Sequence, residues 1–150
     1  MDFTYKNRIT PPNQKVLEII QSAWEEERES ETRLHGMMKL AKDSADRETL
    51  RMLCMDEYKH VKYFAEIYKG LSGHDLPRDA QVRQPPVSWD FYLECEKMIH
   101  KCTENVEFYR RVYFGFNDQE IRDALFEIIT DEINMAIKMT HICNKNRELF

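Results

Sequence analysis

Four long stretches with helical spacing of apolar residues constrain the fold of this chain more than any other feature. In the first stretch, apolar residues and two glutamates recur at alternating steps of four and three residues: Ile20, Trp24, Glu27, Glu31, Leu34, Met38 and Ala41. This spacing places side chains on one face of an α-helix. Stripes of the same kind run over residues 50–67, 91–116 and 121–142, and strand patterning is absent. The sequence predicts an all-α protein built from four helices.

The breaks between these stretches predict two helical hairpins joined by a long crossover. A loose arm over residues 1–12 ends at two prolines, and the second helix is expected to stop at Gly70 and Gly73. Residues 71–87 hold three prolines and several polar side chains, a composition typical of an exposed loop. A loop of this length suits a connection along a helical bundle, as in ferritin-like topologies. We therefore expect residues 1–150 to form one ferritin-like four-helix bundle.

Polar residues at the breaks indicate where the helices begin. Asn13 is expected to cap the first helix and Ser88 the third. Asn117, followed three residues later by Glu120, is expected to form a capping box for the fourth helix. Several residues could cap the second helix: Asp43, Ser44 and Asp46.

The two hairpins keep a common register. Asp43 precedes Glu57 by fourteen residues, and Asp118 precedes Glu132 by the same interval. The matching layout indicates a duplicated pair of helices.

Composition excludes several classes of protein. A formal net charge of −5 without a block of lysines and arginines argues against nucleic-acid binding. No apolar run approaches the roughly eighteen residues that cross a membrane, and the N-terminus lacks the pattern of a secretory signal. A cytoplasmic protein is expected. The four cysteines form no C-x-x-C pair, which excludes a zinc ribbon or a rubredoxin-like knuckle.

The residues that carry chemistry are acidic side chains and one histidine on the apolar stripes. Glu57 and His60 lie three residues apart, so that one carboxylate and one imidazole point towards the same place. Glu27 on the first helix and Glu132 on the fourth also face inward. Buried carboxylates need a cation or a hydrogen-bond network. We predict a metal site, with a satisfied polar core as the alternative.

These residues resemble those of the rubrerythrin-type branch of the ferritin-like di-iron carboxylate proteins, over about residues 13–144. The family places a Glu on the first and third helices and Glu-x-x-His on the second and fourth. The run from Asp56 to His60, DEYKH, is similar to the family's second helix, and Glu27 lies thirty residues before Glu57. The resemblance implies iron held by Glu27, Glu57, His60 and Glu132, where the family binds two irons bridged by carboxylates.

The second half of the chain departs from the family pattern at two positions. Met135 occupies the place of the second histidine, and Cys102 lies thirty residues before Glu132, where a glutamate is expected. Thioether and thiolate groups are soft donors that favour copper(I), zinc or clusters. Three occupancies are therefore consistent with the sequence: one ion, two unequal ions or none, with manganese and zinc as alternatives to iron. Met135 and Cys102 have buried packing as their alternative role.

Other side chains have weaker expectations. Glu31, one turn from Glu27, is expected inward, as a support for the ligands or an alternative ligand. Tyr109 also lies inward and could hydrogen-bond a ligand carboxylate. Surface or capping roles are expected for the remaining histidines: His35, His74, His100 and His141.

The resemblance implies a non-haem iron or manganese oxidoreductase that acts on peroxide or dioxygen. Without a rubredoxin-like domain, electrons would come from a separate partner, and the family also implies a homodimer. Two alternatives belong to other functional classes. One is a protein that stores, delivers or senses metal without turnover, and the other is a metal-free bundle that acts as an interaction protein.

Overall fold

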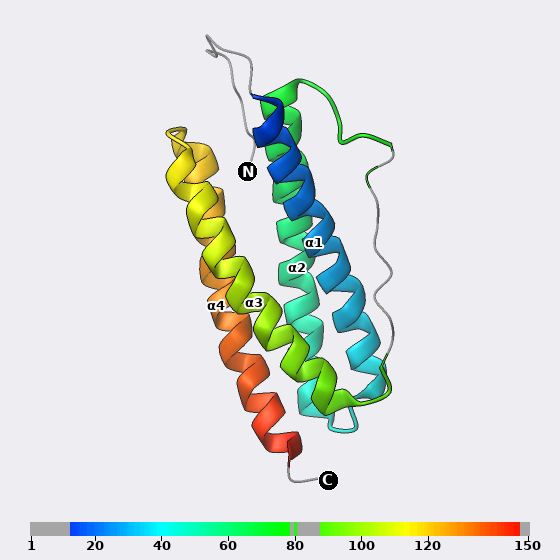
Figure 1. Cartoon of the computed structure of the whole chain (residues 1–150). Coiled ribbons are helices and arrows are strands. Elements are labelled where there is room, and N and C mark those ends of the chain that lie inside the picture. The colour runs from blue at the N-terminus through cyan, green and yellow to red at the C-terminus, as the bar shows by residue number, and fades with distance from the viewer. Residues whose placement is uncertain (1–12, 79, 81–87, 148–150) are drawn as a thin grey trace.

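The computed structural model describes residues 13–78, 80 and 88–147. These residues form four helices and no strand, which confirms the predicted all-α fold (Figure 1). The helices are α1 (Gln14–Leu40), α2 (Ser44–Ser72), α3 (Phe91–Gly115) and α4 (Gln119–Arg147). The expected arm over residues 1–12, and residues 79 and 81–87 of the expected crossover, lie outside the described residues. No helix in the described ranges is long and apolar enough to cross a membrane.

The bundle consists of two hairpins packed against each other. Helix α1 packs along α2 and α3 packs along α4, while α2 also contacts α4 and α1 contacts α3. Helix α2 ends at one end of the bundle and α3 begins at the opposite end (Figure 1). The connection between them therefore spans the length of the bundle, as the crossover prediction requires.

Two of the predicted helix caps are correct and two are wrong. The side chains of Asn13 and Asp43 accept hydrogen bonds from backbone N–H groups at the starts of α1 and α2. Helix α3 is capped by Asp90 instead of Ser88. Helix α4 follows Asp118 instead of Asn117, and the Asp118 carboxylate accepts from the Ile121 N–H at 3.1 Å. At these two helix starts the aspartate directly before the first turn acts as the cap. Its carboxylate also interacts favourably with the helix dipole.

Helix α2 continues past Gly70, the first of the two glycines predicted to end it, and ends just before the second, Gly73. It runs through Leu71 and Ser72, and Gly73 follows with a φ of 77°, the left-handed conformation that glycine adopts readily. A glycine inside a helix costs only about 1 kcal/mol relative to alanine. Burial of Leu71 in the core offsets that cost, so the crossover begins after Ser72.

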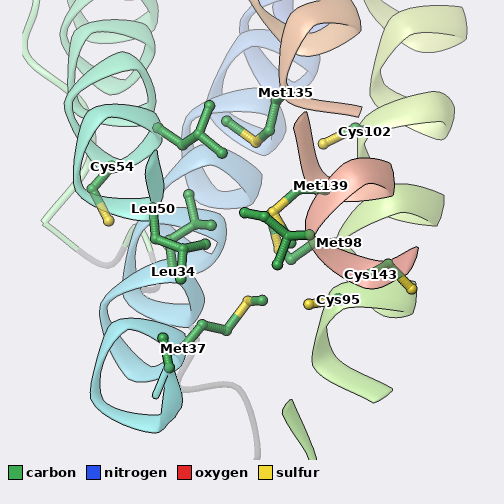
Figure 2. Packing of buried hydrophobic residues seen from close by; sticks show 13 residues of the cluster. Leu34, Met37, Leu50, Cys54, Cys95, Met98, Cys102, Met135, Met139 and Cys143 are labelled. Carbon is green, nitrogen blue, oxygen red and sulfur yellow. The ribbon is translucent and has the colours of Figure 1, made fainter. Parts of the chain in front are cut away.

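Two apolar clusters occupy the two ends of the bundle. The aliphatic cluster is defined by the buried residues Leu17, Ile20, Ala23, Phe64, Ile67, Tyr68, Leu71, Tyr109, Ile121, Ala124, Leu125 and Ile128. The sulfur-rich cluster is defined by the buried residues Leu34, Met37, Ala41, Leu50, Leu53, Cys54, Cys95, Met98, Cys102, Met135, Met139, Ile142 and Cys143 (Figure 2). Between them lies a layer of buried polar side chains, halfway along the helices.

Helix α1 presents a slightly different face to the core than its sequence stripe predicts. Its buried side chains include Ala23, Ser30 and Met37, whereas Trp24 and Glu31 are only partly buried. Large and charged side chains at the flanks of the face keep partial access to solvent, while small ones fit at the close helix contact. Glu27 stays at the centre of the buried face, but Glu31 turns towards its edge.

Candidate metal centre

The polar layer brings together buried side chains from all four helices. Its members are Glu27 and Ser30 of α1, Glu57 and His60 of α2, Asn105 of α3 and Glu132 of α4. All lie inside their helices, where backbone groups are already paired and cannot satisfy a carboxylate. The layer must therefore balance its own charge.

Four of these side chains converge on one point. Glu27, Glu57, His60 and Glu132 each offer one donor atom, and these four atoms all lie within 4.8 Å of one another. Oxygen and nitrogen donors sit about 2.0–2.6 Å from a bound divalent cation, so donors on opposite sides of one ion are at most about 5 Å apart. The spread of the four atoms is that of ligands around a single ion.

Unpartnered oxygens support the fit of a cation to this site. Both carboxylate oxygens of Glu57 and Oε1 of Glu132 are inaccessible and have no hydrogen-bond partner. A buried acceptor without a partner costs roughly 1–3 kcal/mol, and more when it is charged. A divalent ion would neutralise these groups, and the residues present therefore suit a hard or borderline metal.

The imidazole of His60 is oriented for ligation through one nitrogen. Its Nδ1 lies 3.4 Å from Glu27 Oε2, 3.6 Å from Glu132 Oε1 and 4.0 Å from Glu57 Oε1. Its Nε2 lies 2.9 Å from Oδ2 of Asp131. A histidine that donates Nε2–H to a carboxylate keeps Nδ1 free for a metal, and the carboxylate fixes both the tautomer and the ring orientation.

Asp131 links the buried site to the surface of the bundle. Its carboxylate lies 2.7 Å from Nζ of Lys59, which also pairs with Glu127 at 3.1 Å. Tyr63 donates its hydroxyl proton to Glu127 at 2.8 Å. Sequence reasoning missed Asp131 because it lies about 100° from Glu132 around the helix, off the inner stripe. The one feature of the sequence that could have indicated Asp131 is its position directly before Glu132, a predicted ligand.

In the metal-free chain, protons take the place of the cation. Burial and the negative charges of Glu27 and Glu132 raise the pKa of Glu57 well above its usual value. Burial opposes the charged form of His60, but the Asp131 carboxylate on Nε2 and the Glu132 and Glu27 carboxylates near Nδ1 raise its pKa. Burial also raises the pKa of Glu132. Metal binding would displace these protons.

Glu27 stays ionised because its neighbours outweigh its burial. The neighbouring Glu57 carboxyl and His60 imidazole lower its pKa, and Tyr109 donates its hydroxyl proton to Glu27 Oε1 at 2.5 Å. Tyr109 is fully buried, so this bond both satisfies the phenol and orients the carboxylate.

Glu31 does not join the site, contrary to its predicted inward position. It is partly exposed at the edge of α1 and pairs with Arg28 at 3.1 Å. Its place on the inner face is taken by Ser30.

Cys102 and Met135 lie next to the site but outside the group of four donors. Both are buried, and both belong to the sulfur-rich cluster. Burial and the adjacent carboxylates of Glu132 and Glu27 raise the pKa of the Cys102 thiol, so the thiol is neutral in the metal-free chain. The other four histidines are exposed, as their sequence positions predict: His35, His74, His100 and His141.

Comparison with protein-family models, curated proteins and solved structures gives no significant match. The interpretation of this centre therefore depends on its own geometry.

Proposed function

We propose that this chain is a rubrerythrin-like metalloprotein that holds one iron or manganese ion and reduces peroxide or dioxygen. The observation that carries the proposal is the convergence of Glu27, Glu57 and Glu132 on Nδ1 of His60, with unpartnered buried oxygens among them. Three carboxylates and one imidazole form a ligand set that suits iron and manganese. Zinc would also bind such a set, without redox chemistry.

The residues around the site have separate tasks in this proposal. Asp131 holds the ring of His60 in the orientation that points Nδ1 inward, and Tyr109 fixes the carboxylate of Glu27. The apolar clusters on both sides exclude bulk water and keep the local dielectric low. A bound iron or manganese ion supplies the redox change, and a separate partner supplies the electrons.

The burial of the site restricts what can react there. The side chains of Glu27, Glu57 and His60 have no exposed surface, and Glu132 has 1%. Only small molecules such as peroxide or dioxygen are suitable substrates. The same burial favours a second candidate function, in which the chain holds its metal for storage or sensing without turnover.

Peroxide consumption tests this proposal. Protein reconstituted with iron(II) is supplied with a reduced artificial electron donor, and the loss of peroxide is followed together with the metal content. We expect turnover above that of free iron in the wild type, and none in Glu57→Gln. The matched control is Glu48→Gln, which makes the same change at an exposed position of α2 and should retain full activity.

Two results would separate the candidate functions. Iron retained by the wild type without peroxide consumption would contradict the oxidoreductase and support storage or sensing. Equal iron content in the wild type and Glu57→Gln would contradict the site itself.

A further inference from the structure

Sulfur is confined to one end of the core. All eight buried sulfur-bearing side chains of the described residues belong to the sulfur-rich cluster: Met37, Cys54, Cys95, Met98, Cys102, Met135, Met139 and Cys143. The aliphatic cluster contains none and fills its space with leucine, isoleucine and aromatic rings. Filling of core space therefore does not by itself require methionine or cysteine in this bundle.

Four of these sulfur-bearing side chains lie along the seam between α3 and α4, which pack side by side as a hairpin. Met98 and Cys102 lie about one turn apart on the buried face of α3, and Met135 and Met139 lie about one turn apart on the buried face of α4. Figure 2 shows Cys102 and Met98 of α3 and Met135 and Met139 of α4 directed into the same interior space.

The polar layer adjoins this seam at Cys102. Cys102 lies on the buried face of α3, three residues before Asn105 of the polar layer, and Met135 lies on the buried face of α4, three residues after Glu132. The sulfur seam thus begins about one helical turn from the oxygen and nitrogen donors.

We propose that this seam is a binding site for copper(I), with the Cys102 thiolate and the thioethers of Met98 and Met135 as ligands. Thiolate and thioether donors select copper(I) over hard cations. Cys102 is the one member of this ligand set that can become negative, so a monovalent ion and its three ligands together carry no charge, whereas a divalent ion with the same ligands would carry a buried positive charge. Binding breaks the S–H bond, forms a Cu–S bond and releases the proton to solvent, with no change of oxidation state.

The copper(I) site is separate from the proposed iron or manganese site in its ligands. Carboxylate oxygens and imidazole serve the harder ion, and sulfur serves the softer one. Failure of one assignment therefore leaves the other standing, and Glu57→Gln should keep its affinity for copper(I).

Competition with a chromogenic copper(I) chelator tests the proposal. Metal-free full-length protein is titrated with copper(I) under anaerobic conditions, and sulfur-to-copper charge-transfer absorption is recorded in the near ultraviolet. We expect one tightly bound equivalent with this absorption. Cys102→Ser should lose it. Met98→Leu and Met135→Leu conserve volume and keep the fold, yet should each weaken binding at least about tenfold.

Cys54→Ser is the matched control, because Cys54 is buried in the same cluster on α2 and lies 3.8 Å from the sulfur of Met38. It should bind copper(I) as tightly as the wild type. The proposal is overturned if the wild type does not compete with the chelator. It is also overturned if both leucine variants bind unchanged, or if Cys54→Ser weakens binding as much as they do.

Discussion

The two hairpins of this bundle place different donors at corresponding positions. Helices α1 and α2 supply Glu27, Glu57 and His60, whereas α3 and α4 supply Cys102, Glu132 and Met135. In both hairpins a capping aspartate lies fourteen residues before the glutamate of the second helix, so the backbone register is the same. Equivalent helices therefore present oxygen and nitrogen donors in one hairpin, and one carboxylate with two sulfur-bearing side chains in the other.

The largest effect is expected when His60 of the first hairpin is replaced by methionine, the residue at the corresponding position of the second hairpin, Met135. His60→Met places a thioether where the imidazole lies, and we expect iron(II) or manganese(II) affinity to fall at least about 100-fold, because a hard ion loses its nitrogen ligand. Isothermal titration of manganese(II) measures the change. Met135→Leu is the control and should bind manganese(II) as the wild type does.

The reverse exchange should add an ion. The double variant Cys102→Glu/Met135→His gives the second hairpin the donors of the first, with Glu132 shared between two positions. We expect iron content after reconstitution to rise from about one to about two atoms per chain. Content that stays at the wild-type level would show that the hairpins are not equivalent in geometry.

A smaller effect is expected from the contact that orients His60. Asp131→Asn removes the negative charge that holds Nε2–H, and metal affinity should fall by about 10–100-fold. The matched substitution Asp123→Asn, at an exposed-side position of the same helix, should leave affinity unchanged. Equal affinities in the two variants would exclude a role for Asp131 in positioning the ring.

The smallest effect concerns pH in the metal-free protein. The pKa of Glu57 is raised above 4.5 in the folded chain, so its favourable contribution is complete below pH 4.5 and is lost as pH rises towards the folded pKa. Glu57→Gln has no such loss. Relative to the wild type, its unfolding free energy should rise by about 1.4 kcal/mol for each pH unit between 4.5 and the folded pKa of Glu57, and should change no further above that pKa. Urea denaturation with a metal chelator present measures this; a difference independent of pH would contradict the shift.

The fold could be predicted because apolar spacing and helix length leave few alternatives. The helix ends were harder, since several polar residues compete at each break. Asp90 prevailed over Ser88, and Asp118 over Asn117, because a carboxylate directly before the helix satisfies an N–H and faces the positive end of the dipole.

The four converging donors also follow from the stripes, because each lies on a face that must be buried. Two features of the site do not follow from periodicity. Ser30 replaces Glu31 at the inner face through a small rotation of α1, which depends on how the helices pack. Asp131 of α4 contacts His60 of α2, and the residue spacing within one helix cannot predict a contact between two helices.

Elemental analysis of protein purified without chelators tests the central claim most directly. The account predicts close to one iron or manganese atom per chain in the wild type, and almost none in Glu57→Gln purified in parallel. Wild-type protein that remains free of metal after reconstitution with iron(II) and manganese(II) would contradict it.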